Sequence, residues 1–322
     1  MHNSQSGTMV VPTSVDSGNP QAALLNNNCT GCHTGVNAAA DVGSTIPYVL
    51  TTSGVEYGST GTEILSNTLA GGNFYWLTES AAKGHNVKTI SNTNNKVPPG
   101  GSVSMNLTCA GSSGCHGDPA ISNEAYSIRY AHHSDTSLSI DGSTIARSYR
   151  YLDGIVGIED SDYEFRPDAS NHNQYKGYRR TTDDTSTNTE TTMSYLCSRC
   201  HVNFHSGAGD LGFSDDAAPF ESPWLRHPTD FDLADASGSE YDSYNKVSGT
   251  AKAYSVISPV ASTSVASVLP AVLSTAGDAI IMCLTCHRAH GTPNDAILRW
   301  DYKAWPGAAG YNGCEVCHTS KN

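Results

Sequence analysis

Ten cysteines in five pairs, each pair ending in Cys-His, constrain this chain more than any other feature of its sequence. Four pairs have the spacing Cys-x-x-Cys-His, and the fifth has five residues between its cysteines. No cysteine is left over, so a single chemistry should explain all of them. The members of the five motifs are Cys29, Cys32 and His33; Cys109, Cys115 and His116; Cys197, Cys200 and His201; Cys283, Cys286 and His287; and Cys314, Cys317 and His318.

The Cys-x-x-Cys-His pattern is the attachment signature of c-type haem. The two thiols bond the vinyl groups of the porphyrin, and the histidine that follows is the proximal ligand of the iron. A zinc ribbon does not require a histidine after each Cys-x-x-Cys pair, and redox-active thiol pairs belong to thioredoxin-like sequences, which this chain does not resemble. We therefore predict covalent haem c at the four regular motifs.

The longer motif, from Cys109 to His116, keeps the same Cys-His ending. Its intervening residues include Gly111 and Gly114, and a glycine-containing loop can bulge while both sulfurs still reach fixed vinyl positions. The alternative is a small local disulfide beside a surface histidine. Because the proximal geometry is preserved, we predict a fifth haem at this motif.

The composition predicts a fold with little regular structure. Hydrophobic residues make up 38% of the 322 residues and charged residues only 15%, which leaves an excess of glycine, serine, threonine and asparagine. A chain that wraps haems needs no large aliphatic core, because the porphyrins supply apolar surface. We predict a mostly irregular, loop-rich fold with short helices and few short strands, wrapped around a chain of haems. Helical turns are expected at the Cys-His motifs and short strands at 45–50 and 148–155.

The distribution of the motifs indicates one haem-threaded unit over residues 29–322, preceded by a polar arm over residues 1–28. A net charge of −13 argues against a nucleic-acid partner, which would need a basic surface. No stretch reaches the ~18 apolar residues that span a bilayer. Because haem c is attached outside the cytoplasm, we expect an exported, extracellular or cell-surface protein. The first residues do not resemble a signal peptide, so the sequence is expected to be that of a mature chain.

Eight histidines outside the motifs are candidate distal ligands of the irons. His205 follows His201 by four residues and His290 follows His287 by three, so each lies on the proximal side of its own motif. Such a histidine can bind only a neighbouring haem, which would bring two haems into near contact. The alternative for any of the eight is a surface or hydrogen-bonding role. The eight are His2, His85, His132, His133, His172, His205, His227 and His290.

The segment 283–291, Cys-Leu-Thr-Cys-His-Arg-Ala-His-Gly, resembles a haem segment of the extracellular multihaem cytochromes that polymerise into conductive filaments, the nanowire family. Most of the sequence between the matching segments is not alike. In that family a further Cys-x-x-Cys-His precedes Met-His-Asn-Ser, and this sequence does not show it, so either this member has one haem fewer or the sequence starts late. The long 109–115 loop is a second departure. Other matches, in order along the chain, are Met1-His2-Asn3-Ser4, Gly84-His85-Asn86, Cys200-His201-x-x-Phe204-His205 and Leu225-Arg226-His227-Pro228.

The resemblance implies a distal ligand for each of the five haems. It also implies that His2 binds a haem of the next subunit, whereas the alternative for His2 is a frayed terminus with no ligand role. His172 has no counterpart, and neither does the pair His132 and His133. That pair remains an alternative source of ligands, or packs beside haem propionates. The histidines that match the family's distal ligands are His2, His85, His205, His227 and His290.

Irons that each carry two imidazoles leave no coordination site open for a substrate and can only pass electrons. We therefore expect a protein that is not an enzyme and that carries electrons over long range outside the cell, through five closely packed bis-histidine haems. The expected partners are copies of itself in a head-to-tail filament, redox proteins, and acceptors such as metal oxides or other cells. The alternatives are a monomeric periplasmic or surface shuttle, and a multihaem reductase with one haem open on its distal side.

Overall fold

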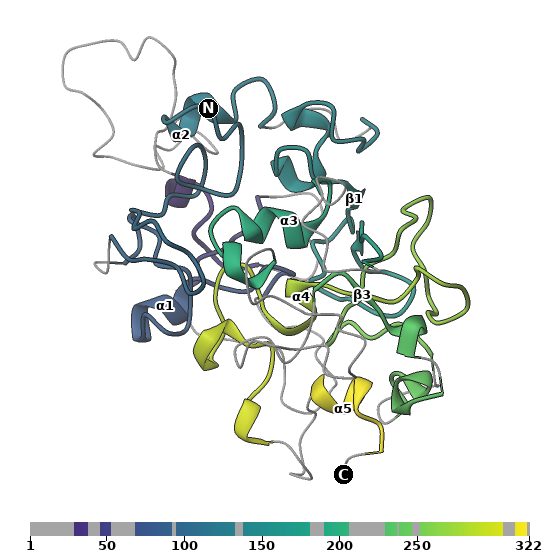
Figure 1. The fold of residues 1–322 in the computed structure, drawn as a ribbon. Coiled ribbons are helices and arrows are strands. Elements are labelled where there is room, and N and C mark those ends of the chain that lie inside the picture. Colours follow the sequence, from purple (N-terminus) through teal and green to yellow (C-terminus); the bar gives the residue numbers. More distant parts are fainter. Residues whose placement is uncertain are drawn as a thin grey trace, which may run out of the picture.

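The computed structural model describes residues 29–37, 46–52, 68–91, 95–132, 138–180, 190–205, 229–236, 238–246, 252–304 and 313–320. Loops make up most of this part of the chain, and its longest helix has six residues. Figure 1 shows the short helices separated by long loops, with α4 and β3 near the centre of the view and α5 beside the C-terminus. The loop-rich fold with short helices and few short strands that the composition predicts is confirmed.

The helices of the described residues are single turns or little more. Thr192 begins α3 by accepting a hydrogen bond from the N–H of Tyr195, and α4 begins after Met282, whose N–H donates to the Thr285 hydroxyl. The α-helices are α1 (Tyr75–Glu79), α2 (Glu124–Ser127), α3 (Met193–Ser198), α4 (Cys283–Cys286) and α5 (Gly313–Cys317). The 3-10 helices are η2 (Cys29–Gly31), η3 (Ile145–Arg147), η4 (Tyr149–Tyr151), η6 (Val202–Phe204), η7 (Leu233–Ala236), η8 (Glu240–Ser243), η9 (Asp295–Ile297) and η10 (Tyr302–Ala304).

Two antiparallel strand pairs join segments that are distant in sequence. β1 (Gly157–Ile158) pairs with β2 (Gln174–Tyr175), and β3 (Phe231–Asp232) pairs with β4 (Ile280–Ile281). In the second pair Phe231 lies opposite Ile281. Since β4 ends two residues before Cys283, this pairing fixes the approach of the chain to the fourth Cys-His motif.

The strands predicted from the sequence are not formed. The segment 148–155 contains η4 instead, and both Arg150 (φ 47°) and Tyr151 (φ 59°) have left-handed backbone conformations that no strand accommodates. In the segment 45–50, residue 45 lies outside the described residues and Leu50 forms only an isolated bridge with Thr34. Alternating hydrophobicity over six to eight residues was therefore a poor guide in this chain.

The apolar side chains of the described residues form four separate clusters rather than one core. The cluster around α3 and α4 contains Leu196, Ile280 and Leu284, and a second contains Tyr244 and Val316, a buried residue of α5. Two smaller clusters lie in the N-terminal third and around Phe165. Cys109 and Cys317 pack against two of these clusters, and Leu284, inside the fourth motif, belongs to a third. No helix among the described residues is long and apolar enough to cross a membrane.

Candidate haem-binding site

All five Cys-His motifs close with the same backbone hydrogen bond. In each motif the histidine N–H donates to the carbonyl oxygen of the first cysteine, at 2.8 to 3.1 Å. In the four regular motifs the bond belongs to a helical turn, in η2, α4 and α5 and at the end of α3, which confirms the turns predicted there. This turn keeps two thiols and one imidazole together, as attachment to a single porphyrin requires.

The long motif reproduces this bond without a helix. The N–H of His116 donates to the carbonyl of Cys109 at 3.1 Å. Gly111 has a φ of +83°, and a Cβ there would lie 2.5 Å from a backbone oxygen. A Cβ on Gly114 would lie 2.5 Å from the backbone nitrogen of Ala110. The two glycines therefore permit the bulge, and His116 keeps the backbone position of the other motif histidines.

Each motif histidine is held through its Nδ1 atom. Nδ1 lies 2.7 to 2.9 Å from an oxygen that can only accept, so Nδ1 carries the proton and Nε2 is the basic nitrogen. Metal-binding histidines typically have such a bond, because it fixes the ring and its tautomer. The acceptors are the carbonyls of Pro47 for His33, Arg150 for His116, Pro99 for His201 and Ala296 for His287, and the carboxylate of Glu240 for His318.

Two of the predicted distal ligands, His85 and His290, are partly buried. His85 has the same arrangement as the motif histidines, with its Nδ1 atom 2.6 Å from the carbonyl of Ala289. His290 stacks on Phe74, with ring centroids 4.6 Å apart. Burial lowers the pKa of His85, and burial together with the nearby His116 and His85 lowers the pKa of His290 to about 3. Both side chains are therefore neutral near pH 7, which is the form that binds metals.

Three motif histidines each lie beside one other imidazole at a characteristic separation. An imidazole nitrogen lies about 2 Å from a metal that it binds and about 1 Å from its own ring centre, so two imidazoles that held one iron between them would have ring centroids roughly 6 Å apart. The three separations bracket this value. The pairs are His33 with His132 at 5.9 Å, His201 with His85 at 6.1 Å, and His116 with His290 at 6.5 Å.

These pairs bear on the predicted ligands in different ways. His290 lies beside His116 of the second motif, as a ligand of a neighbouring haem would. The helical spacing assumed for His287 and His290 is wrong, because α4 ends at Cys286 and His287 is extended (φ −113°, ψ 161°). His132, which the resemblance leaves without a role, lies beside His33. Its neighbour His133 lies outside the described residues, as do His2 and His227.

His205 and His172 have other surroundings. The Nε2 atom of His205 lies 2.9 Å from the carboxylate of Asp230, which is also 3.8 Å from the guanidinium of the buried Arg180. The ligand role of His205 remains a prediction. His172 stacks on Tyr254 with centroids 3.5 Å apart, and its two nitrogens lie 2.9 and 3.3 Å from backbone carbonyls. Those contacts give His172 a structural role.

Cysteines of successive motifs lie close together. The Sγ atoms of Cys29 and Cys109 are within 4.8 Å of one another, and contact between the thiols of Cys197 and Cys283 raises the pKa of Cys197. Burial, and then the nearby Cys200, raise the pKa of Cys115 to about 11.

The fourth and fifth motifs are also neighbours. Burial raises the pKa of Cys286 to about 12, with the nearby Cys314 as the second cause, and Cys286 in turn helps to raise the pKa of Cys317. All ten cysteines are described, and none forms a disulfide. The attachment points therefore follow one another in space in their sequence order.

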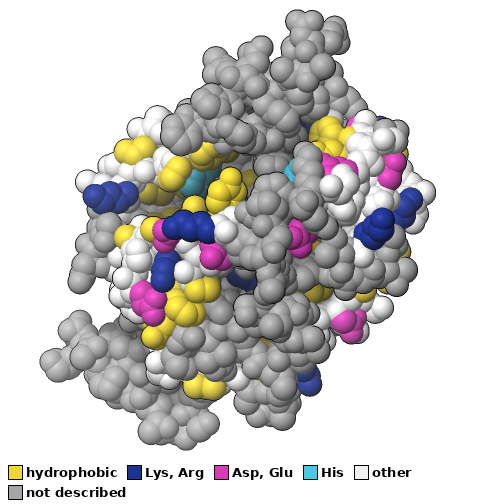
Figure 2. Space-filling view, turned by 90° about the horizontal axis from the view of Figure 1, so that it is seen from below, with side chains coloured by type: hydrophobic (Ala, Val, Ile, Leu, Met, Phe, Trp, Pro, Cys, Tyr) yellow, Lys and Arg dark blue, Asp and Glu magenta, His cyan; other side chains and the backbone are white. Residues whose placement is uncertain are grey.

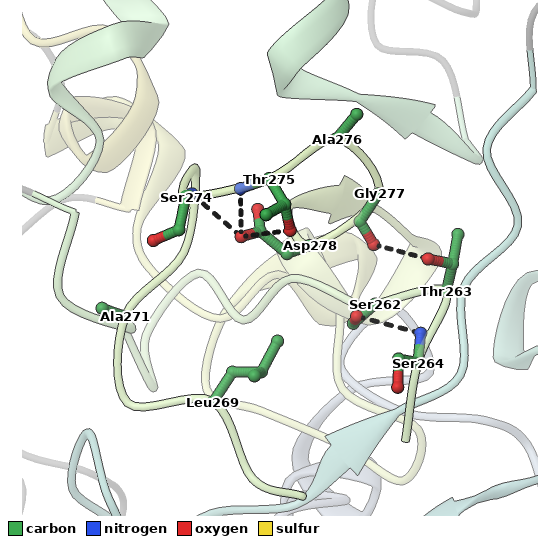
Figure 3. Close-up of a pocket in the computed structure, with 10 residues that line it drawn as sticks. All are labelled: Ser262, Thr263, Ser264, Leu269, Ala271, Ser274, Thr275, Ala276, Gly277 and Asp278. Carbon is green, nitrogen blue, oxygen red and sulfur yellow. Dashed lines mark hydrogen bonds between the residues drawn. The ribbon is translucent and has the colours of Figure 1, made fainter. Parts of the chain in front are cut away.

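The surface of the described residues has a face of mixed side chains and a hollow between loops. On the face shown in Figure 2, acidic, basic and hydrophobic side chains of the described residues are interspersed. A hollow of about 250 Å³ lies within the loops 262–264 and 269–278 (Figure 3). The carboxylate of Asp278 is occupied there by the N–H groups of Leu273, Ser274 and Thr275, and no predicted ligand lines the hollow.

Comparison with known proteins supports the class of site. Residues 275–322, which contain the fourth and fifth motifs, match the family model of the doubled CXXCH motif. No curated protein matches the chain. The structure is similar to the outer membrane cytochrome S filament from Geobacter sulfurreducens, at 21% identity, over 94% of this chain and 82% of the other, with a TM-score of 0.49. It is also similar to the OmcS nanowires from Geobacter sulfurreducens, at 20% identity, over 92% and 81%, with a TM-score of 0.44.

The five sets of two thiols and one imidazole are of the kind that holds covalently attached haem c, and the family model supports this for the two sets in residues 275–322. The hydrogen bonds that hold Nδ1 of each motif histidine, and the three pairs of neighbouring imidazoles, fit this cofactor. The match over residues 275–322 agrees with the haem-attachment motifs that the sequence indicates there.

Proposed function

We propose that this protein carries electrons over long range outside the cell, through five closely packed haems that each have two histidine ligands. The observation that carries the proposal is the pairing of motif histidines with other imidazoles at 5.9 to 6.5 Å. Bound haem supplies one-electron exchange between ferric and ferrous iron. A second imidazole on each iron closes the site to substrates.

The proposed ligand sets combine this geometry with the resemblance. His33 and His132 bind one iron, His116 and His290 a second, and His201 and His85 a third. Two irons then remain, those at His287 and His318, and we propose His2 and His227 as their distal ligands, with His205 as the alternative to either. The neighbouring cysteines set the order of the path, because each haem is tethered beside the next.

The first prediction concerns the number of haems. The shared backbone bond and the two glycines of the long motif favour attachment at Cys109 and Cys115 as well as at the regular motifs. Intact-mass spectrometry of the purified protein should give the polypeptide plus five haems. A mass with four haems would contradict attachment at the long motif and favour the disulfide there.

The second prediction separates electron transfer from catalysis. All five haems should be low-spin, and the reduced protein should not bind CO. The variant His290→Ala should bind one CO per chain, because the iron at His116 loses its opposed ligand. The matched control is His172→Ala, which removes another buried histidine whose nitrogens both contact backbone carbonyls, and which should bind none. CO binding by the unaltered protein would favour the reductase instead.

We further propose that the chain forms a head-to-tail filament and is exported. The solved structures that it resembles are a filament and nanowires. Its partners are then other copies of itself, redox proteins, and extracellular acceptors such as metal oxides or other cells. The monomeric shuttle differs from the filament only in assembly, so electron microscopy of secreted material distinguishes the two.

A further inference from the structure

One motif histidine differs from the other four in what holds its Nδ1 atom. His33, His116, His201 and His287 each face a neutral backbone carbonyl. His318, in the C-terminal motif, instead faces the Oε1 atom of the Glu240 carboxylate, at 2.8 Å. The sequence gives no hint of this, since 77 residues separate Glu240 from His318.

The carboxylate is fixed by contacts on both sides. Its second oxygen, Oε2, accepts a hydrogen bond from the Ser320 hydroxyl at 2.9 Å, and the Glu240 backbone carbonyl accepts one from the Thr319 hydroxyl at 2.8 Å. The Asn245 N–H donates to the Val316 carbonyl, which ties η8 and the residues that follow it to α5.

The contact is also shielded from water. The side chains of Glu240 and His318 are 12% and 17% exposed, and the ring of Tyr241 lies edge-on to that of His318, with centroids 5.6 Å apart. A charged hydrogen bond in such a site is stronger than one in open water.

A carboxylate acts on a metal-bound imidazole differently from a carbonyl. Its negative charge draws the Nδ1 proton and raises the basicity of Nε2. A more basic ligand stabilises ferric iron over ferrous iron, and the nearby negative charge acts in the same direction. Resting on the proposed function, we propose that Glu240 sets the reduction potential of the haem at Cys314, Cys317 and His318 below that of each of the other four.

This assignment gives the row of haems a direction. The fifth attachment site lies beside the fourth, where Cys286 is close to Cys317, and it ends the row. With its haem at the lowest potential, an electron placed there moves downhill to the site at Cys283 and Cys286. Within a single chain Glu240 thus favours the C-terminal haem as the point of entry, and in a filament the same haem is one low-potential site in every subunit.

Glu240→Gln tests the assignment, because glutamine keeps the size of the side chain and removes its charge. In a spectroscopic redox titration of the purified five-haem protein, the unaltered chain should show one midpoint below the other four. In the variant this midpoint should rise by about 59 mV, which corresponds to a tenfold change in the ferric to ferrous ratio for one electron. Glu79→Gln is the control, since it removes the same charge at an exposed site that pairs with Lys83.

The outcomes are distinguishable. If Glu240→Gln carries five haems and its midpoints move no more than those of Glu79→Gln, the assignment is wrong while the proposed function stands. If the unaltered protein carries fewer haems or binds CO, the proposed function fails independently. Should Glu240→Gln not accumulate, the unaltered protein still decides, because five midpoints without a separate lowest one overturn the assignment.

Discussion

A chain in which Cys283 and Cys286 are both replaced by alanine will not reach a stable folded state. These cysteines begin and end α4, which packs on α3, and Leu284 between them belongs to the largest buried cluster. The clusters of the described residues are small, and under the proposed function porphyrin surface completes them. A ring system that buries about twice the area of a large aromatic side chain contributes roughly 10 kcal/mol. This is comparable with a whole domain's net stability of about 5–15 kcal/mol.

Secreted yield and resistance to limited proteolysis measure this effect, and we expect both to be lost. The single variant Cys286→Ala is the matched control. It keeps one thioether and the axial histidines, so it should retain five haems at reduced thermal stability. A double variant that is secreted as a protease-resistant chain with four haems would show that the polypeptide folds without this cofactor, contrary to the prediction.

The local features of the site could be predicted because they are encoded by adjacent residues. The turn at each Cys-x-x-Cys-His motif depends on one backbone bond across four residues, and the loop at Gly111 and Gly114 depends on glycine conformations. The expected strand at 148–155 was wrong because the left-handed backbone at Arg150 and Tyr151 has no signal in hydrophobic alternation. Those residues face the second motif, where the Arg150 carbonyl holds His116.

The non-local features could not be predicted. Carbonyl acceptors such as that of Pro99 belong to the backbone, which every residue has, so no residue type marks them. The approach of His132 to His33 joins segments 99 residues apart, and the resemblance offered no counterpart for it. Asp230 beside His205 and Glu240 beside His318 are likewise ordinary acidic residues in the sequence. Only the folded chain distinguishes these two from the other 29 acidic residues of the sequence.

The variant His2→Ala should abolish long filaments. His2 lies outside the described residues, near the start of the polar arm 1–28, which contains no other histidine. A contact that passes from each subunit to the next without closing generates a filament. Ordering such an arm costs about 1–2 kcal/mol per residue in backbone entropy, and a bond from His2 to an iron of the next subunit would offset part of that cost. Without the imidazole we expect monomers or short oligomers by electron microscopy.

The spectrum of the same variant provides the second half of the test. Losing a ligand supplied by another subunit should leave one haem per chain high-spin and able to bind CO, in addition to ending polymerisation. His227→Ala is the matched control, because the resemblance assigns His227 to a haem of its own chain. It should also open one CO site, yet its filaments should persist. The bridging role is wrong if His2→Ala forms filaments of unchanged length in which every haem stays low-spin, because the arm would then be a terminus with no part in the iron coordination.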